Sequence, residues 1–224
     1  MKPEDFEPIP ALYGPPPFWE EAPVSAISRF RINVDGAGVN TLVTFYGCPL
    51  DCKFCLNDSM KQVPENAKWM STKALYNKVK KDSLYFRATG GGITFGGGEP
   101  LLRADFIREF KEKYAQDWKV RVETSLNVND NSLFYLLSLV DEWIIDVKTL
   151  NMKKYEDYTH GDYLPMYNNL KMLSQAGLCD KCLIRIPLIE GYNDEEDRQH
   201  TLKMLKLLGF TRFDLFTYKI PDHE

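Results

Sequence analysis

Short apolar runs rich in β-branched residues alternate along the chain with longer segments in which apolar residues recur every three or four positions. Six of the short runs predict β-strands, at residues 40–46, 92–95, 119–124, 142–147, 182–188 and 213–218. Five of the longer segments predict helices, namely one that begins near Ser71 and residues 102–114, 131–140, 167–176 and 194–208. This repeated alternation is typical of a parallel sheet with helices outside it.

The number of strands limits the architecture. Six strands are too few for a closed barrel of eight strand–helix units, which takes about 250 residues. An open, partial barrel and a doubly wound sheet are the two arrangements that remain. The continuously apolar runs at 142–147 and 182–188 predict strands that are buried on both faces.

The first thirty residues have a different composition, because they are rich in proline and acidic groups. Three consecutive prolines at 15–17 favour polyproline II and cannot continue a helix. We therefore expect an extended arm over residues 1–30 and a single domain over residues 31–224. Phe18 and Trp19 could pin the arm to the domain, and a docking role toward a partner is the alternative.

Composition and charge exclude several classes of protein. The 224 residues are 44% hydrophobic and 27% charged, as in ordinary globular domains. The formal charge of −4 argues against a protein that binds nucleic acid through its phosphate backbone. No apolar run approaches the ~18 residues that span a bilayer, and the N-terminus lacks the features of a signal peptide. We therefore expect a soluble, cytoplasmic protein with neither a nucleic-acid nor a membrane partner.

An odd count of five cysteines without an export signal indicates metal or redox chemistry rather than a disulfide framework. Cys48, Cys52 and Cys55 follow the first predicted strand in GCPLDCKFC, a C-x3-C-x2-C spacing. Structural zinc sites usually take four ligands in two separated pairs. Iron–sulfur clusters take thiolates, and three cysteines leave one iron of a four-iron cluster open to a further ligand. Three unrelated thiols, or zinc completed by Cys179 or a histidine, are the alternatives.

Other residues that can carry chemistry also follow predicted strands. They are Gly96, Gly97, Gly98 and Glu99 after the second strand, Glu123 and Thr124 on the third, Asp146 and Lys148 on the fourth, and Arg185 and Pro187 on the fifth. Parallel α/β folds build their active sites at the carboxyl ends of strands, so we expect these residues to meet at one mouth. A simple glycine turn, a salt bridge between Asp146 and Lys148, and an ion pair at Arg185 are the alternative interpretations.

The cysteine spacing, with Phe54 before the last cysteine, resembles the cluster loop of the radical S-adenosylmethionine (SAM) superfamily. The segment GGGITFGGGEPLL, at 90–102, resembles the glycine-rich motif of that superfamily. The later motifs VETSLN, IIDVKTLN, YEDYTHG and IRIPLIEGYND are similar in order and spacing to glycyl-radical-enzyme activases, such as pyruvate formate-lyase activating enzyme. The resemblance covers roughly residues 33–218 and implies an α/β fold with a partial (β/α)6 barrel.

The resemblance also implies roles for individual residues. Cys48, Cys52 and Cys55 would hold a 4Fe–4S cluster, whose open iron would bind the amino and carboxylate groups of SAM. The residues that would line SAM are Phe54, Gly96, Gly97, Gly98, Glu99, Glu123, Thr124, Ser125, Asn127, Asp146, Lys148 and Arg185. In pyruvate formate-lyase activating enzyme an aspartate stands where Glu123 stands and helps to hold a monovalent cation with the aspartate that matches Asp146. A monovalent cation is therefore a further expectation, and the longer side chain of Glu123 departs from that pattern. No catalytic residue is expected beyond this cofactor site.

The implied reaction is reductive cleavage of SAM, after which a 5′-deoxyadenosyl radical abstracts hydrogen from a protein. Activation of a glycyl-radical enzyme is the first expectation, with a protein or peptide substrate and a reducing electron donor such as flavodoxin or ferredoxin as partners. A maturase of a ribosomally made peptide is the alternative, and a non-catalytic iron–sulfur scaffold or sensor is a third. We expect Cys179 and Cys182, a second C-x2-C pair, to be core or loop thiols, although zinc or redox use would also fit.

Overall fold

The computed structural model describes residues 21–219. Within them, eight strands form one sheet in the order β3-β1-β2-β4-β5-β6-β7-β8. The strands are β1 (Glu21–Ile32), β2 (Val39–Phe45), β3 (Trp69–Ser71), β4 (Gly92–Gly97), β5 (Lys119–Thr124), β6 (Glu142–Asp146), β7 (Cys182–Leu188) and β8 (Arg212–Thr217). The α-helices are α1 (Thr72–Val79), α2 (Ser83–Thr89), α3 (Ala104–Tyr114), α4 (Asp130–Phe134), α5 (Met152–Thr159), α6 (Tyr163–Gln175) and α7 (Glu195–Leu207).

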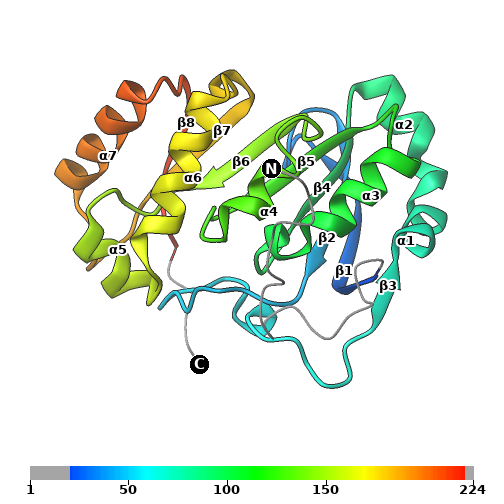
Figure 1. Ribbon diagram of the computed structural model, residues 1–224, viewed down its shortest axis with the longest axis horizontal. Coiled ribbons are helices and arrows are strands. Elements are labelled where there is room, and N and C mark those ends of the chain that lie inside the picture. The colour runs from blue at the N-terminus through cyan, green and yellow to red at the C-terminus, as the bar shows by residue number, and fades with distance from the viewer. Residues whose placement is uncertain (1–20, 220–224) are drawn as a thin grey trace.

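The strands β2 and β4 to β8 run parallel and neighbour one another in the order of the sequence. A doubly wound sheet would reverse its strand order partway, so this sheet is wound in one direction, as barrels are. The strands β3 and β8 end the sheet at opposite sides, and the barrel is therefore partial and unclosed (Figure 1). The six predicted strands are confirmed, each within two residues of its expected bounds.

The strands β1 and β3 add an antiparallel edge that the sequence pattern did not predict. β1 pairs with β2 and, at its beginning, with β3. The second half of β1 alternates half-buried and exposed residues, but its charged residues obscured that period. The boundary expected at residue 30 falls inside β1, so residues 21–30 of the expected arm belong to the sheet. Residues 1–20 of that arm lie outside the described residues.

The strand register gives the parallel sheet two chemically different faces, because successive residues of a strand point to opposite sides. The face that the helices cover is apolar and carries Val43, Phe45, Ile93, Phe95, Val120, Val122, Trp143, Ile145, Ile184 and Ile186. The inner face is polar and carries Thr44, Thr94, Arg121, Glu123, Glu142, Asp146, Arg185 and Asp214. The prediction that β6 and β7 are buried on both faces holds at the centre of β6, where Ile144 on the inner face is buried. It fails at Glu142, Asp146 and Arg185, because the inner face holds half-buried charges there in place of a second helical layer.

Ion pairs join the strands across the inner face at their amino ends. Arg121, which is only 4% exposed, donates from Nε to Glu142 Oε2 and from Nη1 to Asn40 Oδ1, each at 2.7 Å. Arg212 Nη2 donates to the second carboxylate oxygen of Glu142 at 2.5 Å. Glu142 therefore holds together β5, β6 and β8, and its two oxygens are both satisfied.

Local sequence signals explain the helix starts that were predicted. Ser71 caps α1, since its Oγ accepts a hydrogen bond from Ala74 N at 3.2 Å. Asp194 and Asp197 form a capping box at the start of α7. The helices α2 and α5 were not predicted, and α4 is shorter than expected. Among the described residues, no helix has both the length and the apolar content needed to cross a membrane.

Glu142→Gln should make the stability of the protein less sensitive to acid. Burial alone would raise the pKa of Glu142, but hydrogen bonds from Arg212 and Arg121 outweigh it and hold the pKa below its usual range. Such a carboxyl stabilises the fold above its unfolded pKa of about 4.3, and that contribution is lost as the pH falls. The urea unfolding midpoint should therefore drop more steeply between neutral and acid pH in the native chain than in the variant. Equal drops in both proteins would contradict this account of Glu142.

Candidate active site

The residues that were predicted to carry chemistry lie together at the carboxyl ends of the parallel strands. β2 leads into the segment that we call the cysteine loop, residues 47–61, and β4 ends in the glycine motif, residues 96–99. Glu123, Asp146 and Arg185 lie near the ends of β5, β6 and β7 on the inner face. In Figure 1 the chain after β2, coloured cyan, crosses below the sheet toward α5.

The cysteine loop folds back on itself. Gly47 N donates to Met60 O at 2.8 Å and Cys48 N donates to Lys61 O at 2.9 Å. The Lys61 ammonium donates to Cys52 O at 3.2 Å, and its side chain is only 18% exposed. Lys61 therefore closes the loop through both its backbone and its side chain.

The outer part of the loop is attached to the end of α5. Asp51 N donates to Thr159 O at 2.9 Å and Lys53 N donates to Tyr158 O at 3.2 Å. Carbonyl groups in the last turn of a helix have no partner within the helix. The loop supplies those partners and is in turn fixed by a rigid element.

The three thiols of the loop lie close enough to influence one another's charge. Burial, followed by the charge of Glu99, raises the pKa of the Cys48 thiol to about 12. Burial also raises the pKa of the Cys52 thiol to about 11, with the Lys148 ammonium acting against it. Both thiols would have to release protons on binding a metal.

A single metal ion is a poor match for this arrangement. Nowhere in residues 21–219 do three His, Cys, Asp or Glu side chains converge as ligands of one ion. In an iron–sulfur cluster, by contrast, each thiolate binds its own iron and no common centre is needed. The donor set of three thiols on one loop therefore fits a cluster better than zinc.

Two loop residues that the sequence reasoning missed contribute to this geometry. Asn57 Nδ2 donates to Gly97 O at 2.9 Å and so joins the cysteine loop to the glycine motif. Asn57 and Lys61 were both missed because neither residue belongs to a periodic segment. The only available signal was their position within six residues of Cys55.

Two glycines of the glycine motif lie so close to other backbone atoms that a side chain there would overlap them. A Cβ on Gly98 would lie 2.2 Å from Gly47 O, and a Cβ on Gly97 would lie 2.8 Å from the backbone of Phe45. Gly97 also has a φ of +104°, which side chains rarely adopt. Gly96 differs, since a Cβ there would make only ordinary contacts, the nearest at 3.5 Å.

Glu99 joins the glycine motif to the end of β5. Its carboxylate is 1% exposed and accepts hydrogen bonds from Thr124 Oγ1 at 2.6 Å and Leu101 N at 3.1 Å. Ser125 donates to the other oxygen from N at 2.9 Å and from Oγ at 2.7 Å. Burial raises the pKa of Glu99, and these hydrogen bonds act against that rise. Thr124 and Ser125 thus turn their polar groups toward Glu99.

Asn127 has a similar internal role in the structure. Its Nδ2 donates to Tyr155 OH at 2.8 Å and to Asp162 O at 2.6 Å. Tyr155 lies in α5, and Asp162 caps the start of α6. Asn127 therefore holds the start of one helix and the middle of another near the mouth.

Four charged side chains meet on the inner face of the mouth. Arg185 Nη1 donates to Glu123 Oε1, and Arg185 Nε lies 3.4 Å from Asp146 Oδ1. Lys148 Nζ lies 3.4 Å from Asp146 Oδ2. Asp146 Oδ1 is buried and has no hydrogen-bond partner within the described part of the chain. This oxygen is ion-paired with Arg185 but accepts no hydrogen bond, so it can accept one from a ligand.

Phe54 connects the cysteine loop to two distant parts of the chain. Its ring centroid lies 5.7 Å from that of Tyr192 and 6.4 Å from that of Tyr158. Its carbonyl oxygen accepts a hydrogen bond from Tyr218 OH, directly after β8. Tyr218 is a further residue that the sequence reasoning did not select.

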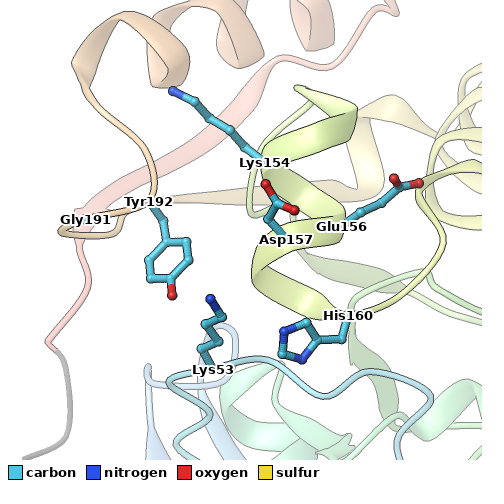
Figure 2. Close-up of a pocket in the computed structure, with 7 residues that line it drawn as sticks. All are labelled: Lys53, Lys154, Glu156, Asp157, His160, Gly191 and Tyr192. Atoms are coloured by element: carbon cyan, nitrogen blue, oxygen red, sulfur yellow. The ribbon is translucent and has the colours of Figure 1, made fainter.

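A surface pocket of about 630 Å³ lies beside the outer part of the cysteine loop (Figure 2). It is lined by Lys53, Lys154, Glu156, Asp157, His160, Gly191 and Tyr192. Figure 2 shows Lys53 rising from the loop toward Tyr192, and its Nζ lies 4.9 Å from the centroid of that ring. The predicted site residues do not line this pocket.

Cys179 and Cys182 lie at the opposite end of the parallel strands, where the strands begin. Cys182 is the first residue of β7 and is fully buried, whereas the mouth lies beyond the other end of that strand. Cys179 Sγ contacts Leu208 O at 3.6 Å, and Cys182 Sγ contacts Leu178 O at 3.3 Å. Their position at the amino end of β7 keeps both thiols away from the cysteine loop.

Comparison with known proteins identifies the family. A family model described as the Radical SAM superfamily matches residues 42–205. The chain is 29% identical over 230 residues to pyruvate formate-lyase 2-activating enzyme of Escherichia coli strain K12, which covers 88% of this chain and 76% of that protein. It is 34% identical over 233 residues to benzylsuccinate synthase activating enzyme of Thauera aromatica, which covers 76% of this chain and 70% of that protein.

Solved structures show the same fold at low sequence identity. Streptococcus suis SuiB bound to S-adenosylmethionine is 16% identical, with a TM-score of 0.61 over 81% of this chain. SuiB bound to its precursor peptide SuiA gives a TM-score of 0.60 at 17% identity. The chain spans only 41% and 42% of the length of those two SuiB chains.

Gly98→Ala should destabilise the protein far more than Gly96→Ala. The added Cβ at residue 98 would overlap Gly47 O at 2.2 Å, whereas the Cβ at residue 96 would fit without displacement. Overpacking of this kind costs about 1–3 kcal/mol, so the thermal midpoint of Gly98→Ala should fall by several degrees. Differential scanning calorimetry of both variants measures this contrast, and similar midpoints would show that the close approach is not required.

Proposed function

The chain belongs to the radical SAM superfamily, and we propose that it activates a glycyl-radical enzyme by removing a hydrogen atom from a glycine Cα of that partner. The observation that carries the proposal is the loop of three thiols at the mouth of an open barrel, directly beside the glycine motif. Relatives named as activating enzymes, at 29% and 34% identity, support activation among the reactions of the superfamily.

The residues at the mouth fit a 4Fe–4S cluster and SAM. Cys48, Cys52 and Cys55 would each hold one iron and leave the fourth for SAM. The Oδ1 of Asp146, which accepts no hydrogen bond, and the ammonium of Lys148 supply groups of both signs, as a zwitterionic ligand requires. When bound, the cluster and SAM would supply a 5′-deoxyadenosyl radical after a one-electron reduction by a donor such as flavodoxin or ferredoxin.

We assign the predicted site residues to two groups. Those that we assign to contact with the ligand are Phe54, Gly96, Asp146, Lys148 and Arg185. Of these, Arg185 also binds Glu123, and Phe54 also packs on Tyr158 and Tyr192. Those whose polar groups or backbone are already bound within the protein are positioning residues, namely Gly97, Gly98, Glu99, Glu123, Thr124, Ser125 and Asn127. The second group holds the strand ends at fixed separations, so that the reacting groups keep their orientation and water has little room.

The pair of Arg185 with Glu123 bears on the monovalent cation expected between Glu123 and Asp146. The guanidinium of Arg185 binds Glu123 and lies 3.4 Å from Asp146. It therefore supplies the positive charge that two neighbouring carboxylates need. We propose that this site works without a bound monovalent cation.

The proposed function is tested by anaerobic incubation of the protein with reductant, SAM and the glycyl-radical enzyme encoded beside it. The expected result is a protein-centred doublet in the electron paramagnetic resonance spectrum of the partner. A mass or chirality change in a co-encoded peptide, without that doublet, would favour a peptide maturase. Binding of SAM without any 5′-deoxyadenosine or methionine would favour a scaffold or sensor.

Replacing any one of Cys48, Cys52 and Cys55 by alanine should abolish the brown absorbance of the cluster and all cleavage of SAM, because each thiolate holds one iron. Cys179→Ala and Cys182→Ala should retain the absorbance and the cleavage of SAM, since these thiols lie where β7 begins and not at its carboxyl end. Iron content, visible spectra and 5′-deoxyadenosine formation measure the contrast. Loss of the cluster in Cys182→Ala, with retention in Cys52→Ala, would overturn the ligand assignment.

Cleavage of SAM should proceed at similar rates in buffers of potassium, sodium or tetramethylammonium salts, because Arg185 supplies the positive charge. Arg185→Gln should weaken the binding of SAM about tenfold, in line with the loss of a charge-assisted contact. In this variant, added potassium should recover part of the lost affinity. A strict potassium requirement in the native chain would show that Arg185 does not replace the cation.

A further inference from the structure

The two edges of the sheet, β1 with β3 on one side and β8 on the other, differ in how well they are protected from pairing with another chain. An exposed edge strand offers unpaired N–H and C=O groups to any extended chain, and proteins usually block such edges. The β1 edge is blocked in several ways: β3 pairs with its beginning, and its register with β2 shifts at two places. Arg29 of β1 also donates to Asp82, and Phe30 packs on Tyr85 of α2 with centroids 5.1 Å apart.

Within the described residues, the β8 edge has neither a pairing strand nor a register shift; its side chains do contact neighbouring elements, for example Phe213 under Lys206 of α7. β8 pairs with β7 in one unbroken register from Arg212 to Thr217, and the sheet ends there. Its sequence, RFDLFT, contains neither proline nor lysine. Leu215 is 40% exposed. Its charged residues, Arg212 and Asp214, pair with Glu142 and Arg185 on the inner face. Among the described residues, the outer edge of β8 is therefore regular and unpaired.

The free hydrogen-bonding groups of β8 can be assigned to particular residues. Tyr218 N donates to Leu188 O on β7. Because alternate residues of a strand direct their N–H and C=O groups to opposite sides, Asp214 and Phe216 also face β7. Phe213, Leu215 and Thr217 consequently direct theirs toward the open edge.

The inner face of β8 lies at the candidate active site. Asp214 lies 4.0 Å from Arg185, and the Arg185 guanidinium lies 5.5 Å from the centroid of the Phe216 ring. Directly beyond the strand, Tyr218 donates to the carbonyl of Phe54 in the cysteine loop. A strand added to β8 would lie about 4.8 Å from it and would pass along the mouth of the barrel.

We propose that the open edge of β8 captures the extended backbone of the substrate protein as a ninth strand of the sheet. This inference rests on the proposed function, in which the target is a backbone Cα–H of glycine. Glycine has no side chain to recognise, so hydrogen bonds to its flanking backbone are the interactions that can position it. The edge beside the mouth supplies them, and the blocked β1 edge does not.

The test measures amide hydrogen exchange in the full-length chain, reconstituted with iron and sulfide. The probe is a capped seven-residue peptide of alternating threonine and valine with a central glycine. The peptide should slow exchange at Phe213, Leu215 and Thr217 by about tenfold at saturation and leave Asp214 and Phe216 unchanged. An analogue that is N-methylated at alternate residues should give no protection.

Leu215→Pro and Leu215→Ala form a matched pair of variants. Proline removes the outward N–H of residue 215, which β7 does not use, and edge strands tolerate it. Leu215→Pro should abolish the protection of Phe213 and Thr217, whereas Leu215→Ala should retain it. Thr217→Pro repeats the test if the first variant folds poorly, as judged by its thermal midpoint.

Three results would overturn the proposal: equal protection by the N-methylated peptide, protection of the inward-facing amides, or protection without any peptide. In the last case, dependence on protein concentration would identify a second copy at the edge, and independence would identify another segment of this chain. Because exchange requires no radical chemistry, a missing glycyl radical with peptide protection intact would count against the proposed function alone.

Discussion

The register between neighbouring parallel strands decides where this protein can place charge. Helices cover one face of the sheet, so every second residue of each strand has to be apolar. The remaining residues face inward, where charged groups are tolerated only when they are paired. Arg121 with Glu142 at one end, and Arg185 with Glu123 at the other, are the pairings that result. The charged groups of the barrel interior therefore form cross-strand ion pairs, and those at the carboxyl ends of the strands line the candidate active site.

This constraint explains what the sequence could predict. The apolar positions of β5 repeat every second residue and those of β7 form an almost continuous run, and the bounds of both strands could be predicted to the residue. The cysteines were predictable because metal chemistry requires a fixed spacing of thiolates along one loop. The convergence of residues from several strand ends followed from the parallel arrangement itself. These inferences all depend on local pattern or on topology.

The remainder of the site depends on partners that are distant in sequence. Glu99 could be placed at the mouth, but its hydrogen bonds to Thr124 and Ser125 depend on the separation between β4 and β5. Asn57 and Tyr218 carry no motif, and their contacts with Gly97 and Phe54 appear only in three dimensions. β1 was missed because an edge strand needs fewer apolar residues than a central one, and its charged residues resembled those of a loop.

The attachments of the cysteine loop also bear on how the protein would acquire, and survive the loss of, the proposed cluster. The loop is held to α5, to the glycine motif and to Tyr218 by hydrogen bonds of the chain itself. In zinc fingers, by contrast, the free energy of metal binding is what folds the polypeptide. Here the ligand loop is ordered by the surrounding fold, so little conformational entropy is lost when iron and sulfide enter. Loss of the proposed cluster would then leave a folded protein that can take up iron and sulfide again, rather than start its unfolding.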